Sequence, residues 1–186
     1  MDQKITDLIY RIDGLVPKDV CQLLISFYNK YEYLAMAERS YKFKDKKNTT
    51  DNFRCINLSK LTNKDFVEDP YYKNGYEGDL PTEEFNQVFN IARQYISIMI
   101  TNYVVNIQKN ICPTFSDLHI NQTDNVRILK YNEGHYIGDH TDVSPSIRAS
   151  CTLNLNEDYE GGEFRFFDGR VKHKFKTGDA MLFPAE

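Results

Sequence analysis

Tryptophan is absent from this chain of 186 residues, and its four cysteines are far apart. None of them forms a C-x-x-C pair, which excludes zinc knuckles and thioredoxin-type motifs (Cys21, Cys55, Cys112 and Cys151). No apolar run reaches the roughly 18 residues that a membrane helix needs, and the first residues lack the apolar stretch of a signal peptide. These absences predict a cytoplasmic protein in a reducing, intracellular setting, with no membrane partner.

Positive charge is not in excess either. The chain has 23 Lys and Arg against 27 Asp and Glu, which gives a formal net charge of −4. Non-specific nucleic-acid binding needs a basic surface, so a nucleic-acid partner is disfavoured. One local group of lysines keeps that alternative open (Lys42, Lys44, Lys46 and Lys47). Nothing in the sequence indicates an oligomeric state.

The hydrophobic content of 41%, with 12 Phe and 13 Tyr, is enough for a packed core, and the length predicts one domain over residues 1–186. Ile9–Ile12 reads as a short strand. Pro17 suits the first turn of a helix, and apolar residues then recur at helical spacing as a core stripe. The residues of that stripe are Val20, Leu23, Leu24, Phe27, Tyr28 and Tyr31.

A second, longer helix is predicted to begin at Thr82, with Glu83 and Glu84 placed favourably at its N-terminal end. Its apolar stripe should pack on the outside of a sheet. The members of this stripe are Phe85, Val88, Phe89, Ala92, Tyr95, Ile96, Met99, Tyr103, Val104 and Ile107. Cys21 and Cys151 fall at apolar-periodic positions and are predicted to be small core residues.

The last third of the chain alternates short strands with glycine-containing turns. Arg148–Asn156 alternates as a strand, Asp168-Gly169 is a hairpin signal, and Gly178–Phe183 reads as a turn followed by an apolar strand. Short strands at regular spacing are typical of a sandwich or jelly roll. On strand 148–156, Ser150, Thr152 and Asn154 share one face, which is either solvated or lines a polar cavity.

Within this region lies the triplet His140-Thr141-Asp142. On an extended backbone its imidazole and carboxylate point the same way. They match two ligands of the 2-His-1-carboxylate set that holds non-haem Fe(II). Because such a triplet is short, a surface turn is the alternative.

The order of these motifs resembles the Fe(II)- and 2-oxoglutarate-dependent dioxygenases, in the prolyl 4-hydroxylase-like branch. The matching elements are Tyr131 with Gly134, His140 with Asp142, Arg148–Asn156, Gly161–Phe166 and Gly178–Phe183. The resemblance implies an α+β protein with a mainly β core. That core is expected to be a double-stranded β-helix (a jelly roll, cupin-like) supported by N-terminal helices. Residues 1–114 then form the helical support and variable loop region, and residues 115–186 an incomplete jelly-roll core.

The resemblance also implies a function. It predicts hydroxylation of a protein or peptide side chain, with Fe(II), 2-oxoglutarate, O2 and ascorbate as cofactors. His140 and Asp142 are the expected metal ligands and catalytic residues. Tyr131, Ser150, Thr152 and Asn154 are the expected co-substrate residues. Arg148 either joins them by pairing with a carboxylate or is a solvated strand-end residue.

Several points stay open at the level of sequence. The family's second histidine follows the Gly-Asp-Ala strand, and the chain reaches Glu186 before it, which predicts a C-terminally truncated dioxygenase. His173 stands between two lysines and is predicted to be a surface histidine rather than the missing ligand. Asp139 either orients His140 or belongs to a turn. The polar region 38–82 either covers the substrate or is a solvated insertion.

Two alternatives to this function are also left open. One is a non-catalytic jelly-roll module or pseudoenzyme, which the missing ligand favours. The other is the same oxidative chemistry on a small molecule or a nucleobase.

Overall fold

The computed structural model describes residues 4–38, 53–62, 82–115, 120, 123, 125–138, 140–142 and 147–185. The chain divides into two compact units. The first consists of Met1–Ile25, Gln94–Thr123 and Asp139–Glu186, and the second of Ser26–Arg93 and Asp124–Gly138. Helices and antiparallel sheets both occur, which confirms a mixed α and β fold, and the strands of the described part do not close into a barrel.

Five helices occur in the described residues, and the two longest agree with the two predicted segments. They are the 3-10 helices η1 (Ile5–Leu8) and η2 (Glu32–Leu34) and the α-helices α1 (Lys18–Lys30), α2 (Leu58–Leu61) and α5 (Thr82–Asn110). Pro17 precedes α1, and its carbonyl accepts the first helical hydrogen bond from Cys21 N. The stripe of α1 is buried at Leu24, but Leu23 is 42% exposed, so its predicted place in the core is wrong. Leu23 lies at the edge of the stripe, about 100° around the helix from Leu24.

The strands of the first unit form a sheet and a hairpin. Sheet A has the order β1-β8-β5, and the hairpin pairs β6 with β7. The bounds are β1 (Tyr10–Ile12), β5 (Ala149–Leu153), β6 (Phe164–Phe166), β7 (Val171–His173) and β8 (Ala180–Pro184). The turn between β6 and β7 contains the predicted Asp168-Gly169, and both residues have positive φ. The strand predicted to reach Asn156 ends as a regular element at Leu153.

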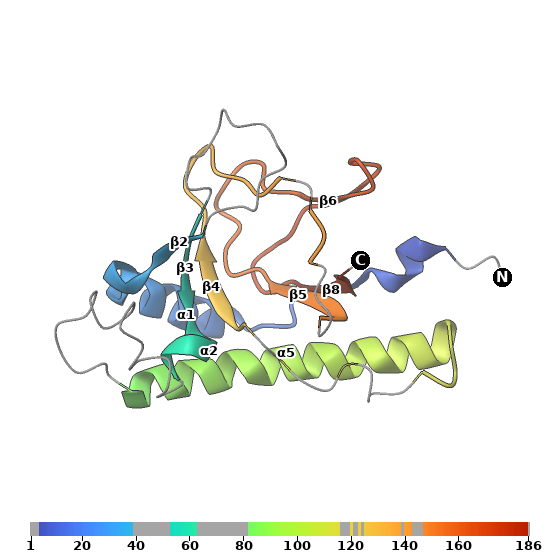
Figure 1. Ribbon diagram of the computed structural model, residues 1–186, viewed down its shortest axis with the longest axis horizontal. Coiled ribbons are helices and arrows are strands. Elements are labelled where there is room, and N and C mark those ends of the chain that lie inside the picture. The colour runs from blue at the N-terminus through green and yellow to red at the C-terminus, as the bar shows by residue number, and fades with distance from the viewer. Residues whose placement is uncertain are drawn as a thin grey trace. The chain divides into compact units, whose positions relative to one another are not determined.

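One face of sheet A packs against the C-terminal part of α5 (Figure 1). Met99, Tyr103 and Ile107 of the helix are buried with Ala180 and Leu182 of β8. The apolar residues of β1 and β5 complete this core from the same side (Tyr10, Ile12, Ala149, Cys151 and Leu153). The helix thus covers one face of the sheet, as predicted, and the other face of sheet A carries the polar residues of β5.

Cys21 and Cys151 are free thiols in this unit, as expected of small core residues. Cys21 is 1% exposed, and Cys151 packs against the α5 core. Burial raises the pKa of the Cys151 thiol to about 12. A thiol with such a pKa stays protonated near neutral pH, so Cys151 is suited to neither nucleophilic attack nor metal binding.

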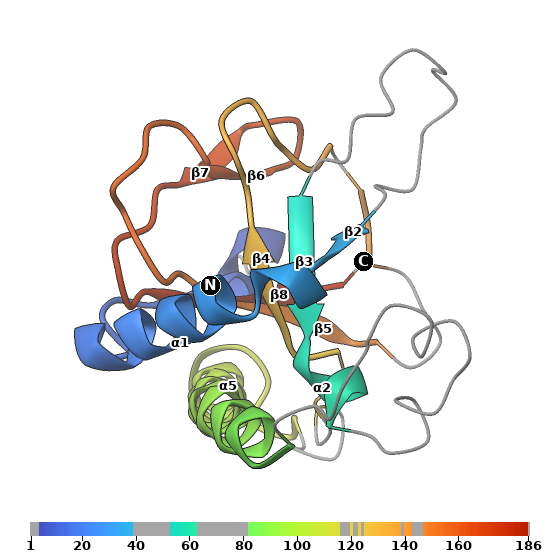
Figure 2. The ribbon, with the colours of Figure 1, turned by 90° about the vertical axis from the view of Figure 1, so that its left-hand side faces the viewer.

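The second unit is built around sheet B, with the order β2-β3-β4 (Figure 2). Its strands are β2 (Met36–Glu38), β3 (Phe53–Asn57) and β4 (Arg127–Lys130). β3 runs directly into α2, where the side chain of Asn57 caps the helix by accepting a hydrogen bond from Lys60 N. Phe27, Tyr31 and Phe85 pack as an aromatic cluster, with ring centroids 4.9 Å apart in each pair.

No helix in the described ranges combines the length and the apolar composition that crossing a membrane requires. The lysine group at 42–47, Asp139 and most of the 38–82 region lie outside the described residues.

Candidate functional site

The polar face of sheet A carries most of the residues singled out in the sequence. Ala149, Cys151 and Leu153 point toward α5, so Ser150 and Thr152 point to the opposite face. A further hydrogen bond from Ala185 N to Arg148 O (3.2 Å) continues the pairing of β5 with β8. This places Arg148, an exposed cation, on the same face as Ser150 and Thr152.

Aromatic side chains border this face. Phe183 of β8 lies directly opposite Ser150 in the register of the sheet. Its ring packs against Phe166 (centroids 5.0 Å apart) and Phe164 (6.2 Å) of the β6–β7 hairpin. Both phenylalanines of β6 thus pack against β8. Ser150 therefore has an apolar wall as its immediate neighbour.

His140 and Asp142 meet at this face. His140 Nε2 lies 3.3 Å from Asp142 Oδ1, and both side chains are partly exposed. The sequence argument placed them on a strand, but residues 140–142 belong to no strand of the structure. The segment is instead held at one point, where Asp142 N donates a hydrogen bond of 3.0 Å to Ala185 O. The two side chains converge as predicted, although for a different structural reason.

A hydroxyl from β5 contacts the carboxylate. Ser150 Oγ donates a hydrogen bond to Asp142 Oδ2, so the two oxygens of this carboxylate have different neighbours. Oδ2 faces a serine hydroxyl, and Oδ1 faces an imidazole nitrogen. Sequence reasoning put Ser150 near the co-substrate and missed its contact with Asp142, because nothing in the local pattern connects residues on either side of a turn.

The His140–Asp142 pair suits two neighbouring metal ligands. Two donors about 2.1 Å from one ion and at right angles lie roughly 3.0 Å apart. The observed separation of 3.3 Å is close to that value. A neutral imidazole nitrogen and a carboxylate oxygen also match the donor types that non-haem iron takes. Within the described ranges, no third His, Cys, Asp or Glu joins them in a metal-binding group.

His173 lies on β7 and is more enclosed than the predicted surface position. Its ring is 6.1 Å from Phe166 in an edge-on arrangement, and its Nε2 is buried without a hydrogen-bond partner among the described residues. Burial lowers the pKa of His173, and the positive charge of Arg11 lowers it further. The imidazole is therefore neutral at pH 7 and packs with the aromatic ring of Phe166.

Tyr131, the remaining co-substrate candidate, belongs to the second unit. It is 42% exposed and stacks on Phe53 of β3, with ring centroids 5.1 Å apart and planes tilted by 31°. Such a ring contact holds the side chain in place.

Asn154 has a different surrounding from Ser150 and Thr152. It follows the end of β5, and its main-chain N still donates to Asp179 O (2.8 Å), the next pair of the β5–β8 ladder. Its Nδ2 donates to Asn156 O (2.6 Å) and Lys176 O (3.1 Å), and its Oδ1 accepts from Tyr159 Oη (3.1 Å). These bonds tie two loops together and give Asn154 a structural role, while its contact with the co-substrate stays a prediction.

We expect Asn154→Ala to lower the free energy of unfolding by about 1–2 kcal/mol, because loop carbonyls and a tyrosine hydroxyl lose a partner. Affinity for Mn(II) should stay within twofold of the wild type. Urea denaturation and a metal titration measure the two quantities. The control is Asn156→Ala, an exposed asparagine whose main-chain carbonyl remains in place. A lower metal affinity in Asn154→Ala with unchanged stability would contradict the structural role.

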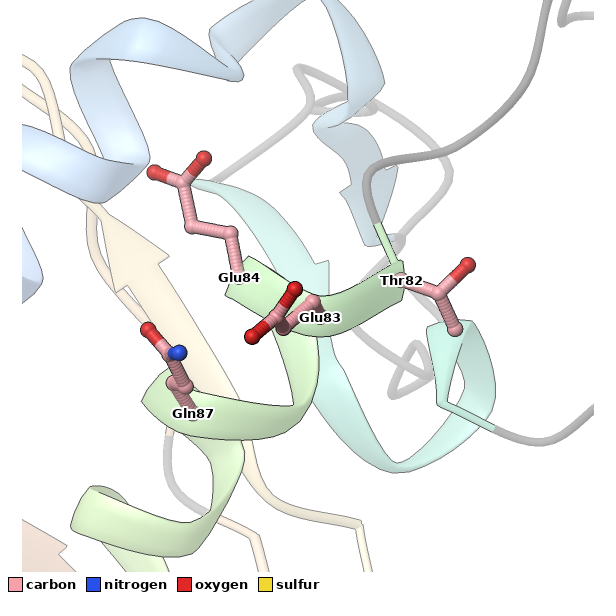
Figure 3. Close-up of a pocket in the computed structure, with 4 residues that line it drawn as sticks. All are labelled: Thr82, Glu83, Glu84 and Gln87. Carbon is pink, nitrogen blue, oxygen red and sulfur yellow. The ribbon is translucent and has the colours of Figure 1, made fainter.

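A separate hollow lies in the second unit, at the N-terminal end of α5 (Figure 3). It is open to solvent, encloses about 600 Å³ and is lined by Thr82, Glu83, Glu84 and Gln87. Glu84 already accepts hydrogen bonds from Lys30 Nζ (2.7 Å) and Tyr31 Oη (2.6 Å). These bonds hold the pKa of Glu84 below its usual value. The hollow is acidic and shallow, and its best-placed carboxylate already has partners within the fold.

Comparison of the chain with protein-family models, with curated proteins and with solved structures gives no match.

Proposed function

We propose that this chain is an Fe(II)- and 2-oxoglutarate-dependent dioxygenase that hydroxylates a side chain of a protein or peptide. The observation that carries the proposal is the 3.3 Å approach of His140 Nε2 to Asp142 Oδ1 on the polar face of sheet A. The ordered motifs of the last third of the chain support it. Bound ferrous ion, with 2-oxoglutarate as co-substrate and O2 as the oxidant, would supply the chemistry for an unactivated C–H bond, and ascorbate would keep the iron in the ferrous state.

The residues of the site have distinct roles in this proposal. His140 and Asp142 would hold the ion through Nε2 and Oδ1. Arg148 gives a positive charge on the same face of the sheet, which suits a dicarboxylate co-substrate. Thr152, two residues beyond Ser150 on β5, adds a hydroxyl that can orient the co-substrate. Tyr131 remains a candidate for the co-substrate carboxylate on the basis of the resemblance alone.

The surroundings of the pair favour a substrate with an apolar portion. Phe164, Phe166 and Phe183 form an aromatic wall next to Ser150. A pyrrolidine ring or an aliphatic side chain buries apolar surface against such a wall, whereas the net charge of −4 disfavours a polyanion. These features support a protein or peptide substrate, with proline as the first candidate.

Metal titration and turnover together test this proposal. The full-length protein should bind Fe(II) under anaerobic conditions and should release succinate from 2-oxoglutarate when O2 is admitted. We expect His140→Ala to lower both the affinity for metal and succinate release at least 100-fold, because loss of a ligand exceeds the roughly 10–100-fold effect of losing an outer-shell partner. Mass spectrometry of products from peptide, nucleotide and amino-acid panels then identifies the substrate class.

His173→Gln is the matched control, since it removes an imidazole of the same unit that lies outside the pair. Its metal affinity should equal that of the wild type. A wild-type chain that binds Fe(II) no better than His140→Ala would contradict the dioxygenase proposal and favour the non-catalytic binding module. Equal losses in His140→Ala and His173→Gln would show that the effect is a general one on folding.

A further inference from the structure

Asp142 is fixed by both its main chain and its side chain. Its amide nitrogen donates to Ala185 O at 3.0 Å, and Ala185 N in turn donates to Arg148 O at 3.2 Å. Its carboxylate accepts the hydroxyl hydrogen of Ser150. An otherwise irregular segment is thereby attached to β5 and to the end of β8. The carboxylate takes its position from sheet A, although Asp142 itself lies outside the sheet.

The hydrogen bond from Ser150 distinguishes the two carboxylate oxygens. Rotation about the last bond of an aspartate side chain is soft, so an unrestrained carboxylate samples many orientations. With Oδ2 held by Ser150, Oδ1 is the oxygen that faces His140 Nε2. A cation placed between the imidazole and the carboxylate would therefore meet one oxygen of Asp142 rather than both.

Ser150 is itself in a well-defined position. It is the second residue of β5 and pairs with Phe183 across the ladder to β8. The Phe183 ring packs against Phe166 of the hairpin, which supports that side of the strand. On the opposite face of β5, Ala149 and Cys151 pack against the α5 core. A hydroxyl on such a strand is oriented more accurately than one on a loop.

We infer that Ser150 is a positioning residue for the metal ligand Asp142, holding its Oδ1 toward the ion, and that it is not a contact of 2-oxoglutarate. This inference rests on the proposed function, since it assigns a role within the same site. It differs from the expectation drawn from the sequence, in which Ser150 belonged to the co-substrate pocket with Thr152.

The test measures metal affinity and co-substrate use separately in the full chain. Ser150→Ala should weaken Mn(II) binding by about 10–100-fold, the usual effect of losing an outer-shell hydrogen bond to a ligand. The electron paramagnetic resonance spectrum of bound Mn(II) should also change. Once Mn(II) or Fe(II) is saturating, the KM for 2-oxoglutarate should stay within twofold of the wild type.

Three further variants make the result specific. Ser150→Thr keeps the hydroxyl on a residue that strands accommodate well, and should restore Mn(II) affinity to within threefold of the wild type. Ser150→Cys keeps the shape with a weaker donor, should give an intermediate loss, and remains informative if Ser150→Ala is poorly folded. Ser97→Ala removes an exposed hydroxyl on α5 and should change neither quantity. Thermal unfolding of every variant identifies any loss of structure.

The possible results separate the two claims. An unchanged Mn(II) affinity in Ser150→Ala, or a raised KM for 2-oxoglutarate with normal metal binding, would overturn the positioning role and leave the proposed function standing. A wild-type chain that binds neither Mn(II) nor Fe(II) would overturn both.

Discussion

Gly178→Ala should destabilise the first unit by about 2–5 kcal/mol, from roughly 1–2 kcal/mol for an unfavourable backbone conformation and 1–3 kcal/mol for steric overlap. Gly178 has a φ of +90°, and a Cβ built there would lie 2.3 Å from the carbonyl oxygen of Val16. That oxygen belongs to main chain and cannot move aside easily. Chemical denaturation monitored by circular dichroism measures the loss, which should appear as an earlier unfolding midpoint.

The backbone around Gly178 explains why relaxation is difficult. Its carbonyl accepts a hydrogen bond from Val16 N (2.9 Å), and its amide donates to Asn154 O (2.8 Å). A shift that accommodated a methyl group would lengthen both bonds. The sequence marked Gly178 only as part of a turn before a strand, whereas the structure gives it this close approach to Val16.

Gly161→Ala separates the two contributions. Gly161 has a φ of +77°, similar to that of Gly178, but no atom lies within 4 Å of a Cβ built at that position. This variant should lose only the backbone contribution, about 1–2 kcal/mol. Equal losses of stability in Gly161→Ala and Gly178→Ala would show that the contact with Val16 contributes nothing to the effect of the Gly178 substitution.

Asp179→Asn should lower the free energy of unfolding at pH 7 by about 3 kcal/mol, near the lower end of the effect of breaking a buried ion pair. The Asp179 side chain is 3% exposed and accepts from Arg11 Nη2 at 2.7 Å. It also accepts from Gly14 N (2.9 Å) and Lys176 N (2.7 Å). An amide has the shape of the carboxylate but carries no charge. Its NH2 group would also face one of the N–H donors that bind the carboxylate.

The same carboxylate makes stability depend on pH. Burial alone would raise the pKa of Asp179, but hydrogen bonds from Lys176 and Gly14 and the charge of Arg11 outweigh it and lower the pKa from 3.8. The charged form is therefore bound more strongly in the folded state. Its contribution is fully present above pH 3.8 and is lost as the pH falls through the lower folded-state pKa.

To check this pH dependence, we would measure the free energies of unfolding of the wild type and Asp179→Asn. The measurements run from pH 7 down to the pH at which the protein unfolds in acid. The difference between the two proteins should be constant above about pH 4 and should shrink below it. Asp168→Asn is the matched control. Its partner Arg170 is 3.7 Å away and both side chains are largely exposed, so the change should stay within about 0.5 kcal/mol. A difference at Asp179 that grows on acidification would contradict the assigned role.

The sequence was most informative where structure is local. Apolar periodicity predicted α1 and α5, because a helix face repeats every three to four residues whatever the rest of the chain does. Turn residues followed by an apolar run predicted the turn and strand at 177–184, and strand alternation predicted the polar face with Ser150 and Thr152. It gave no sign that the side-chain amide of Asn154 binds the loop carbonyls of Asn156 and Lys176.

Contacts between distant parts of the chain could not be read from the pattern. Arg11 and Asp179 are 168 positions apart, and their pairing follows from the register of β1 with β8. The bond from Ser150 to Asp142 depends on how residues 140–142 attach to Ala185, which has no local signature. The jelly-roll arrangement and the metal chemistry remain predictions for the same reason, because each needs long-range geometry beyond the sheets described.

The central place of β8 has a consequence for biosynthesis. Tyr10–Ile12 pairs with residues 180–182, so nascent β1 leaves the ribosome long before its neighbour exists. Until translation supplies that strand, β1 lacks the neighbour it pairs with in sheet A. Such high contact order predicts slow folding of sheet A after synthesis, in contrast to the rapid formation of α1.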